Sequence, residues 1–220
     1  MKKYLLGTAL VAAMFAAAPA ANAATNLIQN GSFEDGVDAG VFTTLAGGDS
    51  TSITGWTVLP YSIDYVGSYW QASDGVRSLD LSGNAKGGVS QTIATILGQK
   101  YTVSFDLAGN PDGGYDTKFM VTTLGNGVGG GAAEIYTFDV GPGNTRDNMG
   151  WTTFTYSFTA TSASTTLNFA SAENSAYGPA LDNVSVSAVP EPATWAMMIV
   201  GFGAAGAMVR NRRKLVPTVA

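Results

Sequence analysis

The sequence predicts an all-β domain, an antiparallel β-sandwich, between two targeting segments. Three observations support this prediction: short runs of alternating apolar and polar residues, clusters of Gly, Asn, Asp and Pro between them, and no amphipathic helical period in the central chain. Each alternating run gives a strand one apolar face for a core and one polar face for solvent. Several such strands separated by turns are typical of a sandwich or barrel, and residues 24–188 suffice for one sandwich.

The alternation is clearest in residues 101–107, where every odd-numbered residue is apolar and the residues between are Thr, Ser and Asp. The same pattern predicts strands within residues 79–81, 136–140, 153–159, 167–169 and 184–186. Residues 125–131 are almost entirely glycine and predict a flexible loop at the tip of a hairpin. A strand pattern follows this loop, so it lacks the helix that a nucleotide-binding glycine motif requires.

Both ends of the chain have the pattern of targeting segments. Lys2 and Lys3 precede an apolar run and the triplet Ala21-Asn22-Ala23, which predicts a helical signal peptide over residues 1–23. Residues 189–194 contain two prolines and predict a stiff linker. The apolar residues 195–209 predict a short transmembrane helix, and the basic residues 210–220 a cytoplasmic tail.

The charge of the central region argues against a nucleic-acid partner. The chain has 16 acidic and 11 basic residues, but six of the basic residues lie in the two terminal segments. Residues 24–187 keep five basic and 15 acidic residues, a formal charge of −10. Such a domain lacks the basic patch that binds DNA or RNA.

The composition also excludes several kinds of chemistry. The chain has no histidine and no cysteine. It therefore has no His-dependent catalytic triad, no His-ligated or thiolate-ligated metal site, no thiol nucleophile and no disulfide.

The C-terminal segment resembles the PEP-CTERM sorting signal in its PEPxxWA form. The residues that carry the resemblance are Pro190, Glu191, Pro192, Trp195 and Ala196, followed by the apolar run and the Arg/Lys cluster. The resemblance implies recognition by an exosortase in the inner membrane of a Gram-negative bacterium, and export to the envelope, the cell surface or the extracellular matrix. Such systems are associated with exopolysaccharide and biofilm material.

The central region is similar to the choice-of-anchor C family and to plant cell-wall proteins with a galactose-binding-like jelly roll. The similarity rests on Asn30-Gly31-Ser32-Phe33-Glu34, Leu79-Asp80-Leu81-Ser82-Gly83 and Gly178-Pro179-Ala180-Leu181-Asp182-Asn183-Val184, among other segments. It implies a jelly-roll sandwich across residues 26–187. It implies little about activity, because one fold carries many functions.

The same resemblance implies one structural Ca²⁺ where the first and last segments of the sandwich meet. The matching residues are Glu34 and Asp182. Calcium takes six to eight oxygen ligands, so these two carboxylates would need loop carbonyls beside them. The alternative is that Glu34 and Asp182 only accept backbone hydrogen bonds in turns.

A group of aromatic and polar residues predicts a sugar-binding surface, because aromatic rings cover sugar C–H groups and polar side chains bind the hydroxyls. Most of this group lies in residues 61–77, and loop residues such as Tyr177 add similar chemistry. The candidate residues are Asp64, Tyr65, Tyr69, Trp70, Gln71, Arg77, Asn110, Asp112 and Tyr115. The alternative is that several of these rings fill the core. We expect that role for Trp56 and Trp151.

Three functions fit these observations. The first is a non-catalytic protein of the cell surface or matrix that binds polysaccharide. The second is a structural or adhesion protein that binds proteins or itself through strand edges or an apolar patch. The third is a secreted glycan-cleaving enzyme, which needs two carboxyl groups at a set separation. No pair of acidic residues stands out for that role, and we favour the first function.

Overall fold

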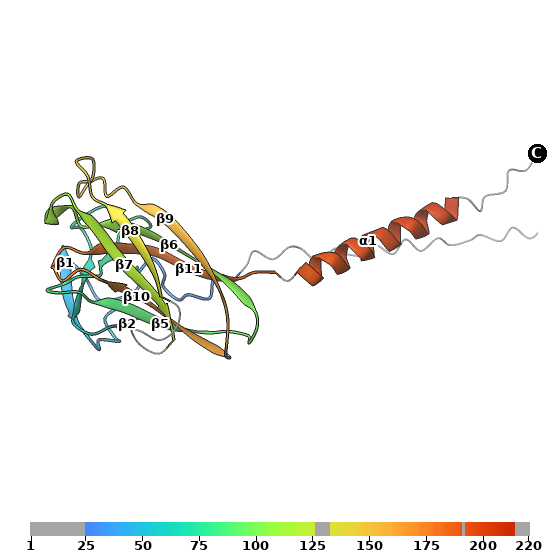
Figure 1. The fold of residues 1–220 in the computed structure, drawn as a ribbon, viewed down its shortest axis with the longest axis horizontal. Coiled ribbons are helices and arrows are strands. Elements are labelled where there is room, and N and C mark those ends of the chain that lie inside the picture. Colours follow the sequence, from blue (N-terminus) through green and yellow to red (C-terminus); the bar gives the residue numbers. More distant parts are fainter. Residues whose placement is uncertain (1–24, 126–132, 191, 214–220) are drawn as a thin grey trace, which may run out of the picture.

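Two antiparallel sheets pack against each other in this protein (Figure 1). The computed structural model describes residues 25–125, 133–190 and 192–213. One sheet has six strands in the order β1-β3-β4-β11-β6-β9, and the other has five in the order β2-β5-β10-β7-β8. All neighbouring strands run antiparallel, which confirms the predicted β-sandwich.

The strands are short, and a single α-helix follows them. The six-stranded sheet comprises β1 (Phe42–Ala46), β3 (Ser62–Val66), β4 (Ser78–Asp80), β11 (Pro179–Ala188), β6 (Lys100–Gly109) and β9 (Thr152–Thr159). The five-stranded sheet comprises β2 (Thr57–Val58), β5 (Gly88–Ala94), β10 (Ser164–Ser171), β7 (Thr117–Leu124) and β8 (Ala133–Asp139). A 3₁₀ turn, η1 (Pro111–Gly113), follows β6, and the helix α1 (Pro192–Arg213) follows β11.

The core lies between the two sheets and is built by the period-two alternation of the strands. Leu79, Leu181 and Leu107 are aligned on β4, β11 and β6, and all three are fully buried. Trp56 is 2% exposed, which confirms its predicted place in the core. Trp151 is half-buried and packs against the core.

The other face of the six-stranded sheet is polar. Thr44, Asp64 and Asp80 are aligned on β1, β3 and β4, one residue out of step with the apolar row. Residues 67–77, here called the cover loop, lie over part of this outer face.

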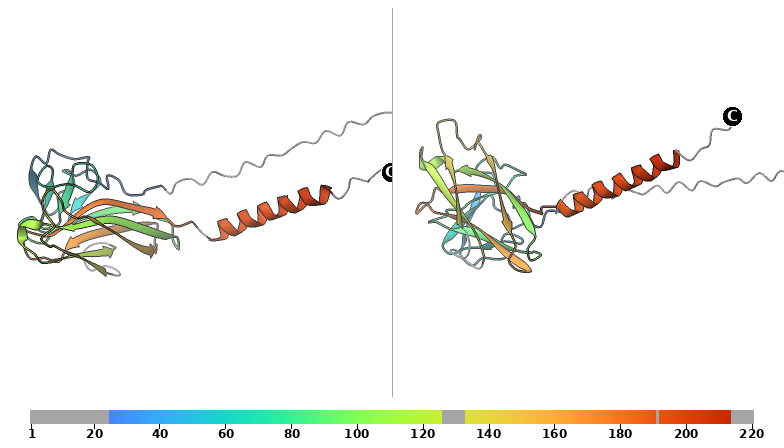
Figure 2. Two further views of the ribbon diagram at one scale, coloured as in Figure 1. Left: turned by 90° about the horizontal axis from the view of Figure 1, so that it is seen from above. Right: turned by 45° about the vertical axis from the view of Figure 1, so that its right-hand side comes forward.

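The two ends of the described sandwich lie together. The Leu27 N–H donates to the Val186 carbonyl (2.8 Å), and the Val186 N–H donates to Asn26 Oδ1 (2.9 Å). The first described residues therefore pair with β11, the last strand. In Figures 1 and 2, α1 extends away from the end of the sandwich at which β11 finishes.

Several predicted segments lie partly or wholly outside the described residues. The signal peptide (1–23), Glu191, and all of the glycine-rich loop except Gly125 are among them. α1 covers the region predicted to cross a membrane. Within the described part of the chain, no helix combines the length and the apolarity that a membrane crossing needs.

Candidate functional site

A cleft of about 270 Å³ opens on the outer face of the six-stranded sheet. It lies toward the end of the sandwich opposite α1. At that end β6 finishes at Gly109 and β11 begins at its partner Pro179, and the cleft residues Asn110 and Tyr177 lie just beyond these two positions. Its lining combines rings, carboxylates and amides, and contains no Lys or Arg. The lining residues are Phe42, Thr44, Asp64, Val66, Tyr69, Trp70, Asp80, Gly83, Asn84, Asn110, Ala176 and Tyr177.

A larger hollow of about 550 Å³ lies beside β9 and β10. Its lining holds one charged residue, Glu134, and no amide side chain. Specific recognition of a polar ligand needs several convergent polar groups. The polar lining of the larger hollow is mostly Ser and Thr, whereas the smaller cleft brings carboxyl and amide groups beside exposed rings, and we therefore take the smaller cleft as the candidate site.

The floor of the cleft contains two neighbouring aspartates, Asp64 and Asp80, here called the open pair. Asp64 is half-buried, and its Oδ1 accepts a hydrogen bond from the Thr44 hydroxyl (2.5 Å). Burial raises the pKa of Asp64, while the bond from Thr44 acts in the opposite direction. Within the described residues no hydrogen bond reaches Oδ2 of Asp64, so this oxygen is available to a ligand.

Asp80 has a different environment, because protein donors surround it. It is 1% exposed, and its carboxylate accepts bonds from the Ser82 N–H (2.8 Å), Asn110 Nδ2 (2.8 Å) and the Gly178 N–H (3.1 Å). A Cβ at position 178 would lie 2.7 Å from Asp80 Oδ1, which explains the glycine there. Burial raises the pKa of Asp80 to about 7. Asp80 therefore positions Asn110 rather than meeting a ligand itself.

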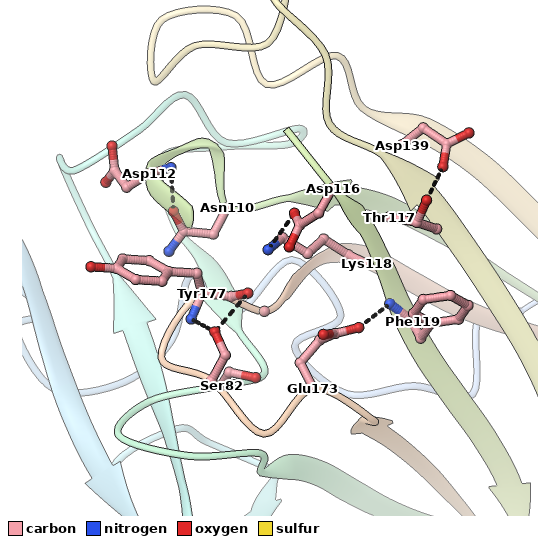
Figure 3. A network of polar contacts seen from close by, with 12 residues as sticks. Ser82, Asn110, Asp112, Asp116, Thr117, Lys118, Phe119, Asp139, Glu173 and Tyr177 are labelled. Carbon is pink, nitrogen blue, oxygen red and sulfur yellow. Dashed lines mark hydrogen bonds and ion pairs between the residues drawn. The ribbon is translucent and has the colours of Figure 1, made fainter. Parts of the chain in front are cut away.

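The aromatic side chains of the cleft come from β1 and from loops. The Phe42 and Tyr69 rings lie edge to face with 5.1 Å between their centroids. Tyr69 is held in place, because its hydroxyl contacts Asp112 Oδ2 and Arg146 Nη2 (both 2.6 Å). Tyr177 is 44% exposed and lies close to Asn110 (Figure 3). The cleft thus offers exposed ring surface beside hydrogen-bonding groups.

A second pair of aspartates, Asp106 and Asp182, lies farther along the same face and is here called the sealed pair. These residues are aligned on β6 and β11, beside a bulge at which Asn183 has a φ of 50°. Asp182 Oδ2 accepts the N–H groups of Ser73 (2.8 Å) and Asp74 (2.9 Å), both in the cover loop. Burial raises the pKa of Asp182 to about 7, although these backbone bonds lower it.

Glu34 holds the far end of the cover loop. Its Oε1 accepts the N–H groups of Val76 and Arg77 (both 2.8 Å). Asp106 completes the attachment, because its Oδ2 accepts the Ser73 hydroxyl (2.7 Å). Three carboxylates from distant parts of the chain therefore fix one loop.

These contacts bear on the calcium prediction. Glu34 and Asp182 both accept backbone N–H groups, which is the alternative role considered for them. In the described residues no group of three acidic side chains gathers in a way that could hold a metal ion. Calcium binding by Glu34 and Asp182 stays a prediction.

Four of the nine predicted sugar-binding residues line the cleft: Asp64, Tyr69, Trp70 and Asn110. Gln71 and Arg77 line a neighbouring hollow of about 470 Å³ on the other side of the cover loop, where Trp70 also takes part. Asp112 and Tyr115 line neither. Asp112 pairs with Arg146 (2.9 Å), and Tyr115 is 71% exposed.

Two of the predicted rings are buried, which favours the alternative that they fill the core, and their contact with a ligand stays a prediction. Tyr65 is fully buried, and its hydroxyl donates to the Phe33 carbonyl (2.5 Å). Trp70 is 5% exposed, and its indole N–H donates to Ser78 Oγ (2.8 Å). Trp70 therefore attaches the cover loop to β4.

Sequence reasoning missed Phe42, Thr44, Asp80 and Asn84 as cleft residues. Asp80 lies between the apolar Leu79 and Leu81, but Thr44 lies between Thr43 and Leu45, so the local pattern gives a signal for Asp80 alone. These residues meet because their strands are neighbours in the sheet. The alternation of apolar and polar residues along one strand contains no information about the order of the strands.

The chain matches two family descriptions. Residues 26–187 match "Protein of unknown function (DUF642)", and residues 188–214 match "PEP-CTERM protein-sorting motif". Over 176 residues the chain is 35% identical to Halomucin of Haloquadratum walsbyi. That match covers 76% of this chain but spans only 2% of the length of Halomucin.

Two solved structures of low sequence identity are similar to this chain. An arabinose-bound α-L-arabinofuranosidase has a TM-score of 0.50 at 13% identity, covering 74% of this chain and 26% of that chain. A Family 16 Carbohydrate Binding Module-2 has a TM-score of 0.45 at 18% identity, covering 73% of this chain and 99% of that chain.

The predicted sorting signal is confirmed, because the PEP-CTERM match includes Pro190 to Ala196. This motif indicates an exported protein that is targeted to the cell envelope. The other match extends across residues 26–187, nearly the whole described sandwich. The chain therefore belongs to the DUF642 family and has a PEP-CTERM sorting motif behind its β-sandwich.

Proposed function

We propose that the protein is a non-catalytic, polysaccharide-binding protein and that its ligand lies in the cleft described above. One observation supports this proposal most directly. The cleft places the exposed rings of Phe42 and Tyr177 beside the free oxygen of Asp64 and the exposed amide of Asn84. Rings cover the C–H faces of a sugar, and polar groups of this kind bind its hydroxyls.

The chemistry of the floor favours binding over cleavage. Hydrolysis of a glycosidic bond needs two carboxyl groups that flank the bond. Of the two carboxyl groups in the cleft, that of Asp80 is enclosed and engaged by three protein donors. Asp64 alone is left to contact the ligand. One carboxyl group cannot act both as the general acid and as the nucleophile or general base.

The position of the cleft suits display at a surface. β11 begins at the cleft end, and α1, with the sorting motif, follows its other end. We propose that an exosortase processes this tail after the tail has associated with the inner membrane. The cleft then points away from the attachment, toward exopolysaccharide at the surface or in the matrix of a Gram-negative cell.

The test is a polysaccharide-binding assay on the purified protein and three variants. Tyr177→Ala removes a cleft ring and Asp64→Ala removes the free oxygen, and we expect each to weaken binding by about tenfold or more. Tyr115→Ala is the matched control, because it removes an exposed ring that lies outside the cleft. We expect its affinity to match that of the original protein.

Two results would contradict the proposal. If Tyr115→Ala weakens binding while Tyr177→Ala does not, the ligand lies elsewhere. If the folded protein binds no polysaccharide, the adhesion hypothesis takes its place. The exposed Phe119 and Ile135 on β7 and β8 are then the surface to test, because they lie on the outer side of the five-stranded sheet.

A further inference from the structure

The charge of the cleft determines which glycans it accepts. Its lining contains two carboxyl groups, two amides and no cationic side chain. Among the basic residues near its walls, Lys118 is paired with Asp116 and Lys86 is exposed two residues after Asn84, and neither lines the cleft. Arg146 is bonded to Asp112 and lies over the Tyr69 ring, 4.0 Å from the centroid. Arg77, the last residue of the cover loop, lines the neighbouring hollow and donates to the Val37 carbonyl and the Tyr65 hydroxyl.

The groups left for a ligand are an anionic acceptor and neutral donors. Asp64 Oδ2 has no bond from the described residues, whereas Asn110 is 5% exposed and its amide already donates to Asp80. Asn84 is exposed and lines the cleft. A sugar hydroxyl can donate to Asp64 and accept from an amide. A ligand carboxylate or sulfate cannot donate, and it would approach the Asp64 carboxylate with no cationic side chain in the cleft lining to offset the repulsion.

We propose that the cleft selects uncharged glycans and excludes glycans that carry carboxylate or sulfate groups. This inference rests on the proposed function, since it concerns the ligand of the same cleft. It assigns to Asp64 a second role: besides accepting a hydroxyl, it rejects anionic chains. The protein would then discriminate among polysaccharides by charge before it discriminates by sugar type.

The experiment compares pairs of polymers that share a backbone and differ in charge. The pairs are hydroxyethylcellulose with carboxymethylcellulose, methyl-esterified polygalacturonate with polygalacturonate, and dextran with dextran sulfate. Binding to the purified full chain is measured at pH 8 and at about 0.15 M salt, where repulsion beyond about 8 Å is screened. For at least one pair we expect the neutral member to bind at least about tenfold more tightly than the charged member.

Two variants separate the effect of Asp64 from the effect of net charge. Asp64→Asn keeps the size of the side chain and removes its charge, so the affinity ratio within each pair should fall toward one. Asp139→Asn makes the same change of charge on β8, in the other sheet, and should leave the ratio unchanged. Equal changes in both variants would assign the selectivity to the overall charge and overturn the role of Asp64.

The remaining outcomes distinguish this inference from the proposed function. If, in every pair that binds, the charged member binds as tightly as its neutral partner, the selectivity is wrong and the polysaccharide-binding function stands. If no member of any pair binds to the folded protein, the proposed function fails and this inference fails with it.

Discussion

The open pair and the sealed pair are two versions of one arrangement. Asp64 and Asp80 face each other across β3 and β4, as Asp106 and Asp182 do across β6 and β11. Both pairs lie on the outer face of the same sheet. The sealed pair lies beneath the cover loop, and its oxygens accept bonds from Ser73 and Asp74. The open pair lies in the cleft that this loop borders through Tyr69 and Trp70, but among the described residues the loop donates no bond to it, and one oxygen of Asp64 is free.

This difference shows that the strands supply the carboxylates and the covering segment decides their use. A buried carboxylate is costly unless donors surround it, and the cover loop provides such donors for Asp182. Where no loop provides them, Asp64 keeps a solvent-facing oxygen. The same residue type in the same register thus has a structural role in one place and, in the function that we propose, a ligand-binding role in the other.

The largest effect that we expect is a difference in unfolding free energy between variants of the two pairs. Asp182→Ala leaves the N–H groups of Ser73, Asp74 and Asn183 without their acceptor, and we expect a loss of about 3 kcal/mol in unfolding free energy. Asp64→Ala removes one exposed contact, and we expect a loss below about 1 kcal/mol. Urea unfolding measures both. Equal losses of unfolding free energy would show that Asp64 and Asp182 do not differ in their contribution to stability.

A medium effect concerns pH. Burial raises the pKa of both Asp80 and Asp182 to about 7 in the folded protein, against 3.8 for an ordinary aspartate. A raised folded-state pKa gives stability that is fully present below the unfolded value and is lost as pH rises through the folded value. We therefore expect the unfolding free energy to fall by about 2 kcal/mol or more from pH 5 to pH 8.

The variants Asp80→Asn and Asp182→Asn test the origin of that slope. Each removes one titrating group, so each should flatten the decline between pH 5 and pH 8. A free energy of unfolding that rises across this range in the original protein would contradict the assignment to these two buried groups.

The smallest effect concerns calcium at Glu34 and Asp182. If Glu34 and Asp182 hold Ca²⁺ as predicted, 1 mM Ca²⁺, about the range in which extracellular modules bind it, should raise the melting temperature by a few degrees. Addition of EDTA should reverse the rise, and Glu34→Gln should abolish it. A melting temperature that does not respond to Ca²⁺ would leave both residues with the loop-binding role alone.

Much of the fold could be predicted from the sequence because most core strands follow the period of two. β6 is the clearest case, since its odd-numbered residues from Tyr101 to Leu107 all face the core. β7 is the opposite case and was not predicted. Its buried side includes Lys118, whose ammonium is paired with Asp116 (2.7 Å), while Phe119 is 42% exposed (Figure 3). A buried lysine, paired with a half-exposed aspartate, therefore reverses the pattern on which the prediction depends.

The candidate site could be predicted only in part. Asp64 and Tyr65 are consecutive, and the sequence suggested that both belong to one irregular binding segment. They lie in β3, where successive side chains point to opposite faces, so Asp64 faces the cleft and Tyr65 faces the core. The pairing of β3 with β4 brings Asp80 beside Asp64, and no local pattern contains that pairing.

The central place of β11 has a mechanical consequence. β11 lies between β4 and β6 and leads directly into the tail that carries the sorting motif. A glycan held at one end and a tail held at the other would apply tension along the strands, at right angles to their hydrogen bonds. All bonds of β11 would then share the load in shear. If the tail were attached to an edge strand and pulled that strand sideways, the hydrogen bonds of the strand would open one after another.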